Sequence, residues 1–505
     1  MNNSSTQIKF GAIIAYLNIG INITTGLLYT PWLIRSIGKD DYGLYTLVMS
    51  VISLFVFDFG LSNAIGRFVA KYLAERKPDQ INNCLGLIYK LYIFLDIILL
   101  LFLVIVYWLI PEIYQKLTPP EIEKFKIIYA IAAIFSIISF PFIPVDGILS
   151  AHEKFILLNT CNLLHKLVLV GAMSICLLLG YGLYALVLTT ALSGVLTIAL
   201  KLFCIRQYTE VRINFAYHEK NELMSIVVFS GWTTVIAISQ RCIFNIAPSI
   251  LGILSGSSSI AVLGIAIMLE GYIFTFANAL NSLFLPRVAN IITNCQQELL
   301  PLMIRIGRIQ ICIIGLLVFG FIFCGHDFIV LWLGKDFSQV YLCAVLLIVP
   351  TFFHLPQGIA TTSVLVVNQV RLQGIVFLVM AAINLILVYP FTKFGGVTGM
   401  SLSICIAYFI RTIGMDLIFW KKLKIDIFKF FKNSFGKLCI PLLLPVVALS
   451  LYYYGSSSAT WLQFFAKVTT FTIVYCSVVF FAGLNHQERI SITVPILKFL
   501  KIAPR

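Results

Sequence analysis

The chain has 505 residues, of which 60% are hydrophobic and 11% are charged, and its net charge is +15. Ordinary soluble domains are about 45–50% apolar and about 25% charged, so this composition excludes a soluble fold and predicts an integral membrane protein. The positive charge does not indicate nucleic acid as a partner, because Lys and Arg gather in the cytoplasmic loops of membrane proteins.

Apolar runs long enough to cross a bilayer follow one another along the whole chain. A spanning helix needs about 20 apolar residues, and fourteen such runs are present. The predicted spans are 10–34, 43–66, 84–110, 126–149, 155–179, 182–204, 223–252, 258–285, 307–333, 340–367, 372–390, 396–420, 437–454 and 460–483. The first run has no cleavage site of the signal-peptide type, so we expect it to be retained as a span.

The loop charges predict the orientation of these spans. With the N-terminus inside, the inner loops and tails hold 24 Lys and Arg residues, whereas the outer loops hold 7. This asymmetry places both termini in the cytoplasm. The outer loops are short, and there is no phosphate-binding GxxxxGK[ST] loop, so neither an external catalytic domain nor ATP as a fuel is expected. The twelve cysteines show no metal-ligand spacing, and no cofactor or metal is predicted.

A weak internal repeat suggests how the spans are grouped. The first span and the seventh span each contain a proline after a Gly-containing start, at Pro31 and Pro248. Each is followed by a helix with one acidic residue. We therefore expect a six-helix lobe over 1–220, a second over 221–436, and two additional helices with a cytoplasmic tail over 437–505. Transporters often use such repeats to form a central site.

The stretch TPWLIRSIGKDDYGLYTLVMSVISLFVFDFGLSNAIGRFVAKYLAER, residues 30–76, carries a recognisable pattern. A Pro-containing first helix leads to an LG…YG.Y turn, then to a helix with an Asp-x-Gly-Leu step and an Arg-x-Val-Ala exit. This pattern resembles the N-terminal signature of Wzx-type polysaccharide-unit flippases, whose wider superfamily also holds lipid II flippases and multidrug antiporters. The matching residues are Pro31, Leu33, Gly38, Tyr42, Gly43, Tyr45, Asp58, Gly60, Leu61, Arg67, Val69 and Ala70.

The resemblance implies an all-α membrane fold with two six-helix lobes around a central cavity that opens alternately to each side. It also implies a location in the bacterial inner membrane and a cargo, an oligosaccharide linked to undecaprenyl pyrophosphate. No enzymatic step is implied. Wzx-type proteins commonly have twelve spans, so the fourteen predicted here resemble the lipid II flippases instead. Membrane lipids and H+ or Na+ are the further partners expected.

Two charges lie near the middle of predicted spans, where an ionised group costs roughly 2.5–3.5 kcal/mol. Arg241 is in the seventh span and Glu270 in the eighth. They either form a buried ion pair between helices or face a wet cavity. In the second case the arginine binds pyrophosphate and the carboxylate exchanges H+ or Na+. The candidate substrate-binding residues are Arg67, Arg241, Asn245 and Asn278.

The acidic residues Asp58, Glu270 and Asp96 are the candidates for ion coupling or gating. Asp58 lies about 24 Å along the second span at 1.5 Å per residue, in its cytoplasmic half. It either bonds to nearby backbone or a Lys at a helix end, or belongs with Arg67 to the cytoplasmic gate or the pyrophosphate entry. Gly60 leaves room for another backbone to approach. Asp96 pairs with Lys166 or belongs to a proton relay.

Three functions are compatible with these features. Translocation of a lipid-linked oligosaccharide is the leading hypothesis. A small-molecule or multidrug antiporter of the same fold is the alternative, although Arg241 disfavours a cationic drug. A membrane glycan polymerase or ligase is the third, and the short external loops argue against it.

Overall fold

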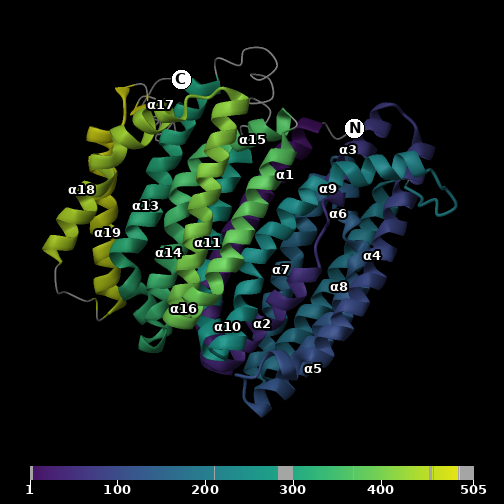
Figure 1. Ribbon diagram of the computed structural model, residues 1–505, viewed down its shortest axis with the longest axis horizontal. Helices are drawn as coiled ribbons and strands as arrows, with labels where there is room; N and C mark the ends of the chain where they lie inside the picture. Colours follow the sequence, from purple (N-terminus) through teal and green to yellow (C-terminus); the bar gives the residue numbers. More distant parts are fainter. Residues whose placement is uncertain are drawn as a thin grey trace. The chain divides into compact units, whose positions relative to one another are not determined.

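The structure is a computed structural model that describes residues 4–209, 211–282, 299–367, 369–453, 458, 460–486 and 488–489. The described residues form helices and the turns between them, without strands (Figure 1). Helices suit the apolar sequence, because each one satisfies its own backbone hydrogen bonds where lipid offers no partner.

The first half of the chain supplies ten α-helices and one 3-10 turn (Figure 1). Several predicted spans are interrupted within it, at residues 56–60, 140–143 and 245. In chain order the elements are α1 (Ser4–Ile37), α2 (Lys39–Phe55), α3 (Leu61–Ala74), α4 (Pro78–Ile113), α5 (Pro119–Ser139), η1 (Phe140–Phe142), α6 (Pro144–Ala151), α7 (Phe155–Leu178), α8 (Leu183–Tyr208), α9 (Lys220–Phe244) and α10 (Ile246–Leu254).

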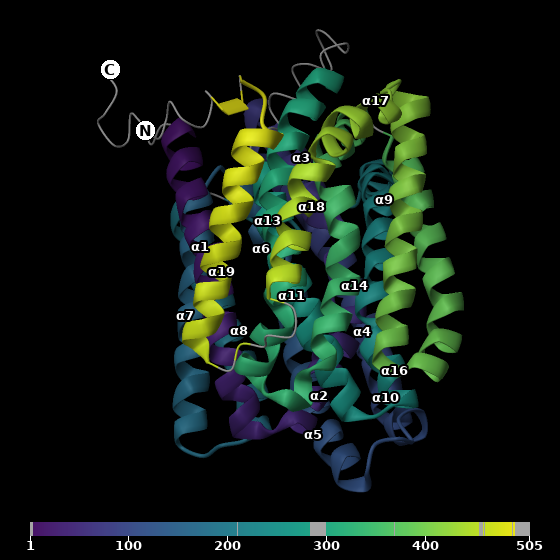
Figure 2. The ribbon, with the colours of Figure 1, turned by 90° about the vertical axis from the view of Figure 1, so that its left-hand side faces the viewer.

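The described part of the second half is helical as well. The elements are α11 (Ser257–Ser282), α13 (Leu299–Leu333), η3 (Lys335–Phe337), α14 (Gln339–His354), η4 (Leu355–Gln357), α15 (Gly358–Val366), α16 (Val370–Leu423), α17 (Ile427–Phe431), the π-helical η5 (Lys432–Gly436), α18 (Lys437–Tyr452), α19 (Trp461–Val478) and the π-helical η6 (Val479–Gly483). Figure 2 shows α18 and α19 beside α13, against which both of them pack.

Twelve helical segments of the described chain are long and apolar enough to cross a membrane, so the protein is a multi-pass membrane protein. The predicted second span is absent from these twelve, because it is divided into α2 and α3. The segment α16 counts once although it covers two predicted spans, 372–390 and 396–420. Twelve segments, the divided span and the second arm of α16 together account for the fourteen predicted spans.

The segment α16 is a helical hairpin. Gly396 inside it has φ 55° and ψ −137°, a conformation that a helix does not contain. The hydroxyl of Ser403 donates to the Oδ1 atom of Asn384 at 3.3 Å, whereas 19 residues of continuous helix would separate them by about 28 Å. The chain therefore reverses at Gly396, the first residue of the predicted span 396–420.

The residues form two compact units. Unit 1 contains Met1–Ile267 and Val370–Ala407, and unit 2 contains Met268–Gln369 and Tyr408–Arg505. Helices α18 and α19 therefore belong to unit 2, together with α13. The lobes 1–220 and 221–436 inferred from the internal repeat stay a prediction.

Two ion pairs fasten the C-terminal helices to α13 within unit 2. The Arg308 guanidinium donates to the Glu488 carboxylate at 2.6 Å, and both side chains are buried. Near the other end of α13, Lys467 donates to the Asp327 carboxylate at 3.0 Å, and Ser458 donates to it as well. Both charges of each pair are therefore compensated, as burial requires.

The reversal at Gly396 can be tested by inserting a reporter enzyme, alkaline phosphatase, after Lys393 or after Lys424. Alkaline phosphatase is active only where its disulfides form, outside the cytoplasm. We expect an active enzyme when it is inserted after Lys393 and an inactive one after Lys424, measured by phosphatase activity in whole cells. Equal activity at both positions would contradict the hairpin.

Glu488→Gln is expected to destabilise unit 2, because it leaves Arg308, 2% exposed, without its counter-charge. Breaking a buried ion pair in this way costs about 3–5 kcal/mol. The matched control is Glu75→Gln, which removes an ion pair to Lys77 in which the two side chains are 36% and 51% exposed. Thermal unfolding of the purified protein should show a clear drop in Tm for the first variant and little change for the second.

Candidate functional site

The interruption of the second span is an unusual backbone feature of unit 1. Helix α2 ends at Phe55 and α3 begins at Leu61. Between them, Phe59 has φ 51° and Gly60 has φ 68°. Glycine adopts this left-handed conformation readily, whereas a bulky residue such as phenylalanine rarely does so. Strained backbone of this kind gathers at functional sites, which makes this interruption the centre of the candidate site.

Asp58 supports the start of α3. Its Oδ1 atom accepts hydrogen bonds from the Ser62 amide at 3.0 Å, the Ser62 hydroxyl at 2.7 Å and the Tyr92 hydroxyl at 2.8 Å. A carboxylate in this position satisfies an amide that the helix itself leaves without a partner and complements the positive end of the helix. Tyr92 comes from α4 and is completely buried. These contacts match the helix-end interpretation of Asp58, and its gating role stays a prediction.

Arg241 supports the end of α2 from the neighbouring helix α9. Its Nη1 atom donates to the backbone carbonyl of Ser53, and its guanidinium carbon lies 5.0 Å from the ring centre of Phe57. In an uninterrupted helix, the Ser53 carbonyl would accept from the amide of Phe57. The arginine takes the place of this lost partner, and a positive charge is favourable at the C-terminal end of a helix.

Helix α9 also lies directly against the residues between the two helices. The Thr234 hydroxyl donates to the Phe59 carbonyl at 2.5 Å. A Cβ atom added at Gly60 would overlap the Thr233 side chain and approach the carbonyl oxygen of Ser230 to 3.1 Å. The predicted close approach of another backbone at Gly60 is thus present, and glycine is required for it.

The structure brings two of the predicted site residues together and places three others nearby in unit 1. Asp58 and Arg241 hold the two sides of the same interruption. Arg67 is exposed on α3, about two turns further on. Asn245 is half-buried at the end of α9, one turn after Arg241. Asp96 lies one turn beyond Tyr92 on α4, and its Oδ1 atom has no hydrogen-bond partner among the described residues.

Asp96 does not form the ion pair with Lys166 that the sequence allowed. Within the described ranges, ion pairs closer than 4.0 Å include neither side chain. Both side chains are half-buried, on α4 and α7 respectively. The proton-relay alternative for Asp96 stays a prediction.

Glu270 and Asn278 belong to unit 2, on α11. Glu270 is 6% exposed and lies within electrostatic range of Arg411 and Tyr408. The Arg411 guanidinium carbon is 5.6 Å from the ring centre of Tyr408. Asn278 is exposed. Thus Glu270 has its own cationic neighbour in unit 2, and the contacts of Arg241 described above are with residues of unit 1.

Sequence reasoning missed the side chains that approach Asp58, Glu270 and the interruption. Tyr92, Thr234 and Arg411 each lie more than thirty positions from the residue they approach, and none forms a local motif. The described residues hold no group of three or more His, Cys, Asp or Glu side chains suited to a metal ion.

Known proteins share both sequence and fold features with the chain. A family model described as "Polysaccharide biosynthesis protein" matches residues 10–292, which is more than half of the chain. No curated protein matches the sequence of this chain significantly. The inward closed conformation of the lipid II flippase MurJ aligns with a TM-score of 0.67 and 13% identity, over 99% of this chain and 100% of that chain. A MATE family multidrug transporter of the MOP superfamily, in its inward-facing conformation, aligns with a TM-score of 0.61 and 16% identity, over 83% of this chain and 99% of that chain.

Gly60→Ala is expected to lower the thermal stability of the protein. The left-handed conformation costs about 1–2 kcal/mol for a residue with a Cβ atom, and that atom would also overlap Thr233. Gly66→Ala is the matched control on α3, because nothing lies within 4 Å of the added atom. Alanine should stabilise this helix by about 0.5–1 kcal/mol. Unfolding curves of the two purified variants that coincide would contradict the close packing at Gly60.

Proposed function

Because the chain belongs to the polysaccharide biosynthesis protein family, we propose that it is a flippase for lipid-linked oligosaccharides. The cargo we propose is an oligosaccharide unit on undecaprenyl pyrophosphate, and the process is alternating access across the bacterial inner membrane without covalent chemistry. The observation that carries the proposal is the family match combined with an arginine, Arg241, at an interrupted spanning helix.

The fold supports a transport function rather than a catalytic one. The protein shares the fold of a lipid II flippase along almost its whole length. Both a flippase and multidrug transporters therefore use this arrangement of helices. In this proposal the translocation takes place within the bilayer, and both termini lie in the cytoplasm, as the loop charges of the sequence predict.

Arg241 is the residue we propose to bind the pyrophosphate. A guanidinium has five N–H donors in a planar fork that fits two phosphate oxygens at once. One of its nitrogens donates to the Ser53 carbonyl. A phosphate carries a full negative charge and can accept two parallel bonds from the guanidinium, whereas the Ser53 carbonyl is neutral and accepts one bond from it. An arriving pyrophosphate therefore competes with Ser53 for the guanidinium.

Through this competition, binding of the cargo can change the conformation of the segment between α2 and α3. When Arg241 turns to the phosphate, the end of α2 loses the donor that replaces its own amide. The segment between α2 and α3 can then change its angle, with Asp58 still supporting α3. Binding and movement are linked, because the cargo prefers the state in which the Ser53 carbonyl has been released.

The remaining predicted residues take supporting roles in the proposal. Arg67 and Asp58 would meet the cargo at the cytoplasmic side, and Asn245 and Asn278 would bind its polar groups. Glu270, beside Arg411 in unit 2, would exchange H+ or Na+, with Asp96 as a second candidate. Membrane lipids are the other expected partner, and nucleic acid is not one.

A multidrug or small-molecule antiporter is the second candidate, because MATE family transporters have the same fold. Such proteins and flippases differ in cargo rather than in architecture. A cationic drug would be repelled by Arg241, whereas a pyrophosphate would be attracted.

A deletion strain distinguishes these functions when lipid-linked oligosaccharides and surface glycan are measured together. We expect complete lipid-linked units to accumulate on the inner side and surface glycan to be lost. Normal surface glycan would contradict the flippase function and favour the antiporter. Lipid-linked units that reach the outer face without being polymerised would instead favour the hypothesis of a glycan polymerase or ligase.

Arg241→Gln should reduce glycan export at least tenfold in a complemented deletion strain, because the amide has neither the charge nor the fork of the guanidinium. The glutamine amide still offers a donor to the Ser53 carbonyl, so we expect the Tm to change little. Arg241→Lys should restore part of the export. Arg212→Gln is the control, since it removes an exposed arginine elsewhere in unit 1. Normal glycan export with Arg241→Gln would contradict the proposal that Arg241 binds the pyrophosphate.

A further inference from the structure

The connection between α8 and α9 is fixed along the side of α4. We call residues 211–219 the strap. Its Asn214 amide donates to the Asn82 carbonyl at 3.1 Å, and the Asn214 side chain donates to the Asn83 side chain at 2.7 Å. A Cβ atom at Gly86 would overlap the Asn214 carbonyl oxygen, so the strap lies directly on the helix there. The strap therefore forms a fixed wall rather than a loose loop.

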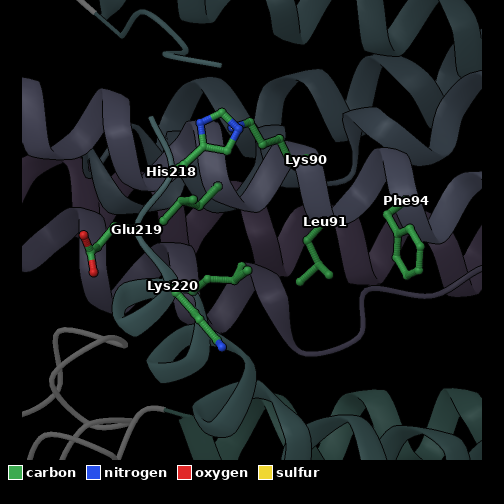
Figure 3. A pocket seen from close by; sticks show the side chains of 8 residues that line it. Lys90, Leu91, Phe94, His218, Glu219 and Lys220 are labelled. Atoms are coloured by element: carbon green, nitrogen blue, oxygen red, sulfur yellow. The ribbon is translucent and has the colours of Figure 1, made fainter. Parts of the chain in front are cut away.

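A pocket of about 440 Å³ lies between the strap, α4 and the beginning of α9, all within unit 1. Its larger part is an apolar wall, and its smaller part is a basic end. The apolar wall consists of Leu87, Leu91, Phe94 and Leu223, and the basic end of Lys90, His218 and Lys220. Figure 3 shows Lys90 and His218 side by side at one edge of the pocket, with Leu91 and Phe94 further along α4.

The Lys90 ammonium group at the basic end has one N–H that is available to a ligand. Its ammonium group donates to the Tyr217 carbonyl at 2.8 Å and contacts His218 Nε2 at 3.0 Å. An ammonium group has three donors, and these are its two hydrogen-bond partners in the described part of the chain. Lys90 is therefore held in place by the strap while one N–H remains for a ligand.

Lys220 adds a second positive charge on the opposite side. It is exposed, and within the described ranges it takes part in no ion pair. Glu219 also lines the pocket. In Figure 3 its carboxylate points away from Lys90, Leu91 and Phe94. The pocket therefore offers a bound anion the Lys90 ammonium group at one edge and the positive charge of Lys220 at the opposite edge.

The apolar wall opens to the surroundings of the protein. Phe94 is 60% exposed and faces outward, while Leu87, 4% exposed, forms the floor. In a spanning helix, an exposed phenylalanine faces lipid. A lipid chain can therefore lie on this wall without leaving the bilayer, and the basic end lies toward the loops that the charge distribution predicts to be cytoplasmic.

We propose that this pocket binds an anionic phospholipid of the cytoplasmic leaflet. Its phosphate accepts a hydrogen bond from Lys90 and is attracted by the charge of Lys220 at the opposite edge, and one acyl chain lies along Leu91, Phe94 and Leu223. Basic pockets on the cytoplasmic side of spanning helices bind anionic lipid head groups by this combination of charge and apolar contact. Because the lipid would touch both the strap and α4, it would hold the connection between α8 and α9 in place.

The chemistry of the pocket favours a phospholipid over the cargo proposed above. One ammonium donor with a second positive charge nearby suits a single phosphate, whereas sugar units need several hydrogen-bonding side chains. Apart from His218 and Glu219, the rest of the lining is apolar. The proposal is independent of the cargo's identity, because it concerns a resident lipid at the side of the protein.

Native mass spectrometry of the full chain tests the proposal with phosphatidylglycerol and phosphatidylcholine as probes. We expect one phosphatidylglycerol to be retained more tightly than any phosphatidylcholine. Lys220→Gln should weaken this binding about fivefold, since each basic residue near a charged lipid contributes about that factor. Lys90→Gln combined with Lys220→Gln should weaken it further, and Phe94→Ala should weaken the binding of both lipids. Lys421→Gln and Phe203→Ala, exposed residues outside the pocket, are the matched controls.

The variants separate lipid binding from folding. Lys90 also holds the strap, whereas the Lys220 side chain has no described partner, so Lys220→Gln removes charge alone. Equal retention of the two lipids, or unchanged binding by Lys220→Gln and the double variant, would overturn the proposal. It would also be overturned if polyprenyl phosphate bound to the pocket and phosphatidylglycerol did not, because the site would then belong to the carrier lipid.

Discussion

The rest of the candidate site depends on one constraint: hydrocarbon offers no hydrogen bonds to an interrupted backbone. The second span is interrupted between Phe55 and Leu61, so side chains must serve the amides and carbonyls that the helix leaves without partners. Asp58 does so for the start of α3, and Arg241 does so for the end of α2. Two charges that are costly in a membrane are thereby explained by the backbone groups they satisfy.

Because neighbouring helices hold the interruption in place, a movement of those helices changes the backbone between α2 and α3. Tyr92 of α4 and Thr234 of α9 both bond to residues between α2 and α3. Any ligand that draws Arg241 away from the Ser53 carbonyl changes this balance. A spanning helix built in this way is suited to alternate between two arrangements, which a translocation cycle requires.

Hydropathy and loop charge were sufficient to predict the class of fold, because the bilayer imposes a length and an orientation on each span. They also predicted the turn within α16, where Gly396 separates two apolar runs. The interruption at Phe59 and Gly60 was not predicted, since its partners Tyr92, Thr234 and Arg241 come from distant positions. The Arg411 neighbour of Glu270 was missed for the same reason, since contacts between helices leave no local pattern in the sequence.

The most direct test of the central claim is a translocation measurement on the purified protein in vesicles. Undecaprenyl pyrophosphate carrying a labelled oligosaccharide is placed in both leaflets, and a glycosidase is added outside. Vesicles that contain the protein should expose the inner-leaflet pool to cleavage, whereas empty vesicles should protect it, and Arg241→Gln should slow the exposure. Protection of the inner-leaflet pool in the presence of the wild-type protein would contradict translocation by this protein.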